Sequence, residues 1–232
     1  MASGRHGARR VARRLATAGL AGLILLTGAC GGGGADDPLG RPWEVTQLPG
    51  GGIEVLGLRP GESRMAEALA LLGPRVEAAL FTAPGDGAVV EAYYSSVNAG
   101  GITGRLVLTL DLPEAVLEGL RARSPDVKRT RTGAIRYTLS MDDSELLLGA
   151  PIRAVTFVPS VDLKEEVVRA RFGTPAERVE TAAGEVHLLY PELGLDVLIA
   201  RGGRTLLQYG HPEDFDWLRR EASRHQEAAA GR

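Results

Sequence analysis

Two histidines in the second half of the chain stand near carboxylate side chains, a pairing that general acid–base chemistry uses. His187 lies in an apolar stretch that alternates like a β-strand, and Glu185 falls on the same side of that strand. His211 opens the run HPEDFD at 211–216, which places three acidic residues beside an imidazole. A histidine next to a carboxylate can take up and return a proton, and the 211–216 run also has side-chain types found in metal sites.

Both groups also fit a purely structural role. The 211–216 run is typical of a helix start, because Pro212 suits the first helical position and early acidic residues complement the helix dipole. No Gly-x-Ser-x-Gly pattern marks a serine nucleophile that could work with His187. We therefore interpret His187 as a surface or interface residue and assign no catalytic residue.

Neither a metal ion nor a cofactor is expected. A single cysteine excludes an internal disulfide, and with four separated histidines it makes a Cys- or His-based zinc cluster unexpected. The glycines at 50–52 and 100–101 lack the Lys-Ser/Thr or Gly-x-Gly-x-x-Gly context of a phosphate-binding loop. These glycines are interpreted as turns.

The cysteine, Cys30, follows a segment with the order of features found in bacterial export signals. Five arginines and no acidic residue lie within residues 1–14, and an apolar run follows from Leu15 to Leu26. This run is shorter than the roughly 20 residues that cross a bilayer. The letters LTGAC at 26–30 resemble the lipobox of bacterial lipoproteins, which implies a cleaved signal peptide at 1–29 and an acylated Cys30. An ordinary secretory signal with a chance cysteine is the alternative.

An acylated linker is expected at residues 30–42, since Gly31 to Gly34 and the polar residues after them favour no regular structure. Each buried methylene contributes about 0.8 kcal/mol to membrane binding, so two or three acyl chains hold a protein stably. Gly31, and not aspartate, follows the cysteine. In Gram-negative lipoproteins this resembles the pattern of the outer membrane, which implies an anchor there with the protein facing the periplasm.

Length and charge limit the classes of partner. The 232 residues, 44% hydrophobic and 24% charged, are typical of one or two globular domains. Five of the 27 basic residues lie in residues 1–29, which leaves 22 against 29 acidic residues and a net charge of −7. This charge argues against nucleic acid as a partner and against broad binding to anionic lipid beyond the anchor.

Five residues are candidate contacts with a protein partner. Tyr93 and Tyr94 place one ring on each side of an expected strand, so one belongs to the core and the other is free for contact. Arg129 and Arg131 belong to the densest basic stretch of the chain. His187 is the fifth.

Two segments of the chain share an order of features, which predicts a duplication. In the first, a strand over Gly52–Leu58 precedes a helix that starts near Ser63 and ends at Gly73. In the second, a strand over Pro151–Val158 precedes a helix that starts near Asp162 and ends at Gly173. Short polar N-caps and a glycine before a proline are helix start and stop signals.

The remaining pattern predicts mostly strands separated by hairpin-length turns, which favour antiparallel pairing. Helices are expected at 113–123, 141–148 and 212–228, and strands at 89–94, 105–112, 134–139, 178–181, 185–190, 195–200 and 205–209. The expected fold is α+β, with two tandem repeats at 43–125 and 126–232. Each repeat packs a helix on an antiparallel meander, and the second adds the C-terminal helix.

This order of elements resembles the SmpA/OmlA family of small lipoproteins of outer-membrane protein assembly, whose wider fold group includes the tandem-repeat β-lactamase-inhibitor proteins. The matching residues are Leu58, Leu72-Gly73-Pro74 and Tyr94 in the first copy, and 172–175 and Tyr190 in the second. The resemblance implies a lipid-tethered, non-enzymatic module that binds or scaffolds an envelope protein. An inhibitor or immunity-like protein that blocks a periplasmic enzyme is one alternative, and a cell-envelope hydrolase is another.

Overall fold

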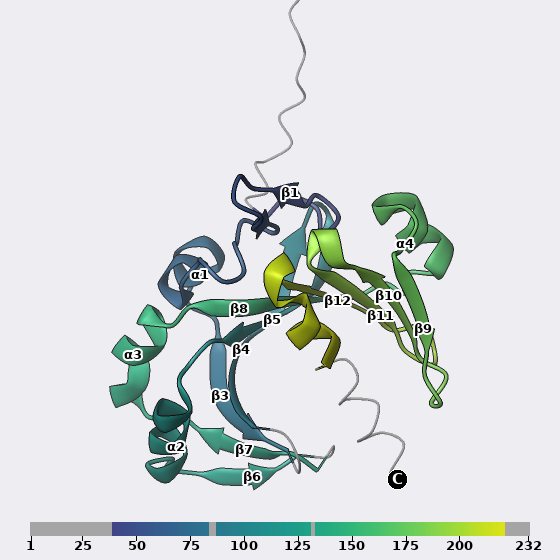
Figure 1. Ribbon diagram of the computed structural model, residues 1–232. Helices are drawn as coiled ribbons and strands as arrows, with labels where there is room; N and C mark the ends of the chain where they lie inside the picture. Colours follow the sequence, from purple (N-terminus) through teal and green to yellow (C-terminus); the bar gives the residue numbers. More distant parts are fainter. Residues whose placement is uncertain (1–38, 84–86, 131–132, 221–232) are drawn as a thin grey trace, which may run out of the picture. The chain divides into compact units, whose positions relative to one another are not determined.

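The computed structural model describes residues 39–83, 87–130 and 133–220, which belong to one compact unit (Figure 1). The predicted signal peptide, Cys30 and most of the predicted linker lie outside these residues. Within the described residues, no helix has both the length and the apolar character needed to cross a membrane.

One antiparallel sheet of ten strands runs through the described residues. In order across the sheet, the strands are β6 (Val127–Arg129), β7 (Ile135–Thr138), β3 (Glu77–Thr82), β4 (Ala88–Ala99), β5 (Ile102–Leu110), β8 (Ile152–Pro159), β12 (Thr205–Gly210), β11 (Leu195–Ile199), β10 (Val186–Tyr190) and β9 (Glu177–Glu180). A separate two-stranded sheet pairs β1 (Thr46–Gln47) with β2 (Ile53–Glu54). The predicted α+β class with antiparallel strands is confirmed.

The α-helices and the main hydrophobic core lie on one face of the sheet. The α-helices are α1 (Met65–Leu72), α2 (Glu114–Ala122), α3 (Ser144–Gly149) and α4 (Glu165–Phe172), and the 3-10 turns are η1 (Met141–Asp143), η2 (Pro191–Leu193) and η3 (Pro212–Asp214). Alternate residues of the central strands, such as Leu106, Leu108, Val155 and Phe157, are fully buried in this core. Gly104 leaves room for the Phe157 ring, since a Cβ there would lie 2.5 Å from the ring.

The predicted helix ends agree with the structure, but the predicted starts lie too early. The N-cap of α1 is Arg64, and the Ser63 hydroxyl accepts from the Arg59 N–H (3.2 Å) and donates to Glu67 (3.1 Å). The N-cap of α4 is Lys164, two residues after the expected Asp162. The capping side chains of Ser63 and Asp162 therefore do not mark the residues at which the two helices begin.

Gly73 and Gly173 end their helices in nearly the same backbone conformation. Both have φ of 84°, with ψ of 176° and −162°, and each N–H bonds to the carbonyl oxygen four residues earlier at 2.9 Å. Positive φ with extended ψ is a region that essentially only glycine occupies. The glycine stop signals are therefore confirmed, although the conformation is extended rather than left-handed helical.

The predicted boundary between repeats at residue 126 differs from the connections in the sheet. Strands β6 and β7 follow this residue, yet β7 pairs with β3, so they extend the first half of the sheet. The two strands expected to be equivalent also differ, because β2 pairs only with β1 whereas β8 is central, between β5 and β12. What the halves share is a helix followed by a meander: α1 precedes β3–β4–β5, and α4 precedes β9–β10–β11–β12. The duplication itself stays a prediction.

The C-terminal segment covers part of the other face of the sheet. It begins with η3, and residues 215–220 continue as a helix; the rest of the helix expected to 228 lies outside the described residues. Phe215 and Leu218 pack with Leu189 in a small apolar cluster separate from the main core. In Figure 1 this yellow segment lies on the opposite side of the sheet from α1 and α3.

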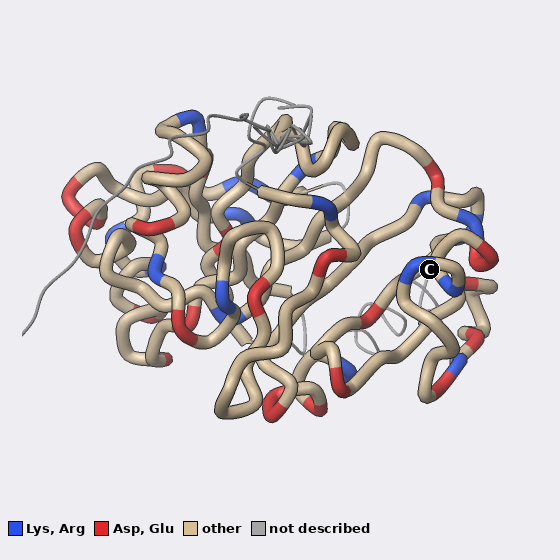
Figure 2. The backbone as a smooth tube through the Cα atoms, turned by 90° about the horizontal axis from the view of Figure 1, so that it is seen from above, with Lys and Arg blue, Asp and Glu red and all other residues tan. Residues whose placement is uncertain are grey.

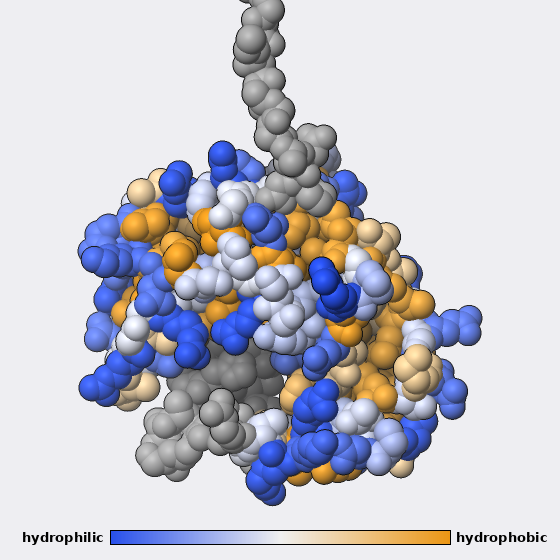
Figure 3. Space-filling view, turned by 180° about the vertical axis from the view of Figure 1, so that it is seen from behind, coloured by the Kyte–Doolittle hydropathy of each residue, from blue (hydrophilic) through white to orange (hydrophobic). Residues whose placement is uncertain are grey.

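The surface carries mixed charge and scattered apolar side chains. Acidic and basic residues are interspersed over the described backbone in Figure 2. Seen from behind in Figure 3, apolar side chains reach the surface in patches among hydrophilic ones. The most exposed large apolar residues are Val127, Met141, Leu148, Val161 and Val167. Apolar residues exposed singly are normal in globular domains and do not by themselves mark a binding site.

Candidate functional site

A row of four side chains, three of them polar, crosses the sheet on the face opposite the main core. Val107 of β5 lies opposite Thr156 of β8, and Thr156 lies opposite Gln208 of β12. Gln208 in turn lies opposite Asp196 of β11. Because successive side chains point to opposite sides of a strand, these residues share one face, which we call the cavity face.

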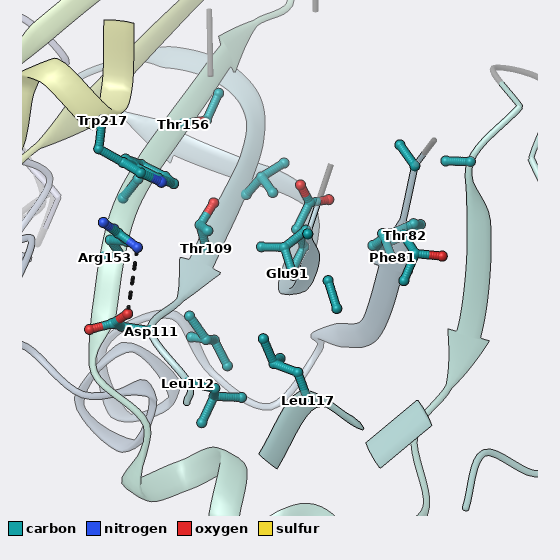
Figure 4. Close-up of a pocket in the computed structure, with 18 of the residues that line it drawn as sticks. Phe81, Thr82, Glu91, Thr109, Asp111, Leu112, Leu117, Arg153, Thr156 and Trp217 are labelled. Carbon is teal, nitrogen blue, oxygen red and sulfur yellow. Dashed lines mark ion pairs between the residues drawn. The ribbon is translucent and has the colours of Figure 1, made fainter. Parts of the chain in front are cut away.

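A cavity of about 580 Å³ opens on this face in the half formed by β3, β4, β5 and β8 (Figure 4). Its apolar walls include Phe81, Val89, Val107, Leu112, Leu117 and Trp217. Its polar lining includes Thr82, Glu91, Thr109, Asp111, Arg153, Thr156 and Gln208. A volume of roughly 300–1,000 Å³ with mostly apolar walls and a few polar groups is typical of ligand sites.

Arg153 is the cation in the described lining of the cavity, and two neighbours hold it in place. Its guanidinium lies 4.1 Å from the centroid of the Trp217 ring, a stacking contact that fixes the plane of the group. The Asp111 carboxylate is 3.7 Å from Nη1, longer than a direct hydrogen bond, and its side chain is 59% exposed. Arg153 Nε has no hydrogen-bond partner in the described structure. The guanidinium is thus positioned, but its donors are only partly used.

Glu91 and Thr109 stand opposite each other on β4 and β5 and give the cavity floor an acid and a hydroxyl. Glu91 is half-buried and already has an interaction partner. No serine, cysteine or histidine belongs to the described cavity lining. The lining therefore offers shape, hydrogen bonds and charge, which are the means of binding a ligand.

The other half of the cavity face holds a buried histidine–aspartate pair. His187 Nδ1 lies 2.8 and 3.1 Å from the two carboxylate oxygens of Asp196, and the residues are 2% and 0% exposed. Burial raises the pKa of Asp196, and the hydrogen bond with His187 opposes this shift. His187 Nε2 is buried without a hydrogen-bond partner in the described structure. Leu189, two residues along on the same side of β10, packs under Phe215 and Leu218.

The interpretation of His187 as a surface or interface contact is therefore wrong. Its partner is Asp196, not Glu185, and the sequence contains the signal that could have found it. The connection at 191–194 places Tyr190 opposite Leu195 and Leu189 opposite Asp196. An acidic residue in the middle of the apolar strand β11 is the feature that predicts a buried polar partner.

The remaining candidate contacts lie in different places. Tyr94 is 2% exposed, so its assignment as a partner contact is wrong; burial raises the pKa of its hydroxyl. Tyr93 is half-buried and lies opposite Val107, on the cavity face. Arg129 is exposed on the edge strand β6 and donates to the Gly133 carbonyl at 3.1 Å. Arg131 lies outside the described residues.

Sequence reasoning missed the residues that the cavity brings together. Arg153, Trp217 and Glu91 are separated by 62 residues or more, and only the pairing of β4, β5 and β8 with the C-terminal segment places them around one space. The helix-start interpretation of the 211–216 run agrees with the structure, since His211 Nδ1 accepts from the Glu213 N–H at 3.2 Å. In the part of the chain that the structure describes, no three His, Cys, Asp or Glu side chains gather in a way that could hold a metal ion.

No protein-family model, no curated protein and no solved structure matches this chain.

Proposed function

We propose that this protein is a lipid-anchored lipoprotein of the cell envelope whose cavity binds part of another envelope protein and performs no catalysis. The cavity carries the proposal, because about 580 Å³ of space with apolar walls and a few placed polar groups matches binding sites in size and lining. The anchor is Cys30, and its sequence context favours the outer membrane, facing the periplasm.

The cavity lining suits an apolar side chain on a protein segment. Phe81, Val107 and Leu112 offer apolar surface, and each apolar side chain buried against them contributes about 1.5–3 kcal/mol. Arg153 and Thr109 lie close to that surface and can bond to polar groups of the segment's backbone. An apolar pocket beside fixed polar groups is the arrangement of binding hot spots.

The positions of the two histidine groups support binding over hydrolysis. His187 is buried and bonded to Asp196, His211 caps a turn, and neither belongs to the described lining of the cavity. A hydrolase needs its base and nucleophile within reach of one bound substrate.

An inhibitor or immunity-like protein that binds a soluble periplasmic enzyme would use the same cavity. The two proposed functions differ in their need for the membrane anchor, because such an inhibitor binds its partner without it. Removing the acylation site therefore separates them.

The test is photo-crosslinking in intact cells. A photoreactive residue replaces Thr109 on the cavity floor or, as a control, Met141, which is 87% exposed and outside the described cavity lining. We expect one envelope protein to crosslink to the Thr109 position and not to the Met141 position. We expect Cys30→Ser to abolish this crosslink.

Each other outcome decides against part of the proposal. A crosslink from Thr109 that survives Cys30→Ser favours the soluble inhibitor. Equal crosslinking from both positions removes the cavity as the binding site. Absence of any partner at Thr109 contradicts the binding function.

A further inference from the structure

The described chain is fixed to the domain from its first residues. Leu39 is 6% exposed and belongs to the main core, and Pro42 is buried. The hydroxyl of the fully buried Tyr209 donates to the Pro42 carbonyl oxygen. The Arg41 side chain packs directly on Gly100, where an added Cβ would clash with Arg41 Cγ. Any free tether therefore ends before residue 39.

This fixed point leaves a short reach between the anchor and the domain. Nine residue steps separate Cys30 from Leu39. At about 3.3–3.6 Å per residue, fully extended chain of that length spans roughly 30 Å. If Cys30 sits at the membrane, the surface around Leu39 stays within that distance of the headgroups.

The surface beside this point carries a mixture typical of membrane interfaces. The guanidinium of Arg171 lies 4.5 Å from the centroid of the Trp43 ring. Lys164, Val167 and Arg171 are spaced by three and four residues, so they line one side of α4, where Val167 is 41% exposed. We call Trp43, Lys164, Val167 and Arg171 the tether-end surface.

We propose that the tether-end surface lies against the lipid headgroups when Cys30 is acylated; this rests on the lipid anchor of the proposed function. Tryptophan rings and the stems of lysine and arginine favour the boundary between headgroups and acyl chains. Exposed Glu166 on the same helix offsets part of the positive charge. The contact is therefore made by the ring and the aliphatic groups, and it does not require anionic lipid.

The two tryptophans of the chain provide the test, since Trp43 lies on this surface and Trp217 lines the cavity. Trp217→Phe leaves Trp43 as the single reporter, and Trp43→Phe leaves Trp217. Each acylated variant is placed in phosphatidylcholine vesicles with bromine on the acyl chains near the glycerol. We expect loss of Trp43 emission and unchanged Trp217 emission relative to unbrominated vesicles.

Two exposed valines give a test variant and a matched control. Val167→Glu puts a charge on the tether-end surface and should remove the quenching of Trp43. Val127→Glu puts the same charge on β6, where Val127 is 53% exposed, and should leave the quenching unchanged. Equal effects of the two variants would overturn the assignment of this surface.

The anchor and the surface can fail separately. Unquenched Trp43 in vesicle-bound, acylated protein overturns the lipid contact and leaves the anchor intact; crosslinking of this surface to a protein would then identify it as a protein-binding face. If Cys30 is found to carry no acyl chains, the proposed lipid anchor is wrong. In that case coupling the thiol to a maleimide-bearing phospholipid repeats the quenching test with the same expected result.

Discussion

The two halves of the cavity face carry similar polar side chains, but only one half is covered. Over β10 to β12, the C-terminal segment packs on Leu189, and the His187–Asp196 pair is fully enclosed. Over β4, β5 and β8 the face stays open, and Val107 and Thr109 remain half-buried around the cavity. Trp217 stands between the halves, because it packs against the covered cluster and also lines the cavity.

The difference shows how a cover changes the role of polar groups. Buried polar groups have to bond to each other, since water no longer reaches them. His187 Nδ1 and the Asp196 carboxylate do so, while His187 Nε2 has no hydrogen-bond partner in the described structure. In the open half, Arg153 keeps donors that no nearby group fully uses. We infer that the covered half stabilises the sheet and that the open half is kept for binding.

The largest loss of stability is expected when the His187–Asp196 pair in the covered half is broken. Asp196→Ala leaves His187 buried with no hydrogen bond to its ring, and removing one member of a buried pair costs about 3–5 kcal/mol. Thr109→Ala in the open half should cost no more than about 0.5 kcal/mol. Urea unfolding followed by circular dichroism measures both. Similar losses for the two variants would contradict the distinction between the halves.

The glycines that end α1 and α4 test whether the two helix ends are equivalent in their backbone. Gly73→Ala and Gly173→Ala each force an alanine into a conformation that costs about 1–3 kcal/mol. Nothing lies within 4 Å of an added Cβ at either position, so the cost comes from the backbone alone. Thermal and urea unfolding should give matching losses. A loss at only one glycine would show that the two helix ends are not equivalent.

Two carboxyl groups, Asp196 in the covered half and Glu165 on α4, should give opposite dependences of stability on pH. Burial raises the pKa of Asp196, so its contribution is present below the ordinary aspartate pKa and is lost as pH rises through the raised value. The hydrogen bond from Arg169 is the main cause that lowers the pKa of Glu165. Its contribution is therefore present above the ordinary value and is lost as pH falls.

Urea unfolding from about pH 3 to about pH 7 tests this with Asp196→Asn and Glu165→Gln, and a single group changes the slope by at most about 1.4 kcal/mol per pH unit. Asp196→Asn should remove the fall in stability at rising pH, and Glu165→Gln the fall at decreasing pH. The same change of slope in both variants would refute the assignment.

A smaller loss than that of Asp196→Ala is expected at the border between the halves. Arg153→Met removes the guanidinium from the Trp217 ring and should cost about 0.5–1 kcal/mol. In a Trp43→Phe background, the emission of Trp217 should shift because its environment changes. Arg105→Met, at an exposed arginine of β5, is the control and should leave the emission unchanged.

Local patterns in the sequence predicted single elements better than their assembly. Helix α2 was expected at 113–123 and is present at Glu114–Ala122, and the four strands β9 to β12 lie within one or two residues of their expected bounds. Strand β3 was missed because its letters EAALFT show no clear alternation. Strand β6 was missed because all three of its residues are exposed and two are basic.

The cavity could not be predicted in the same way. It depends on pairing between β5 and β8, which places Val107 opposite Thr156 across 49 residues of sequence, and no periodicity encodes a contact at that separation. The His187–Asp196 pair could have been predicted, since the short hairpin connection sets the register and places Asp196 opposite Leu189, diagonally across from His187 on the same face. The alternation correctly separated the two tyrosines of β4 but left open which one enters the core.

The place of β12 in the sheet also bears on when the chain can fold. It supplies the strand between β8 and β11, and it carries Tyr209, whose hydroxyl bonds to Pro42 at a separation of 167 residues. Closing such long loops is entropically costly, so contacts of this kind form late. We expect a chain still emerging from the ribosome to lack the strand that joins β8 to β11 until residue 210 is free. Until residue 210 has been synthesised, such a chain would therefore stay open enough to be threaded through a translocation channel.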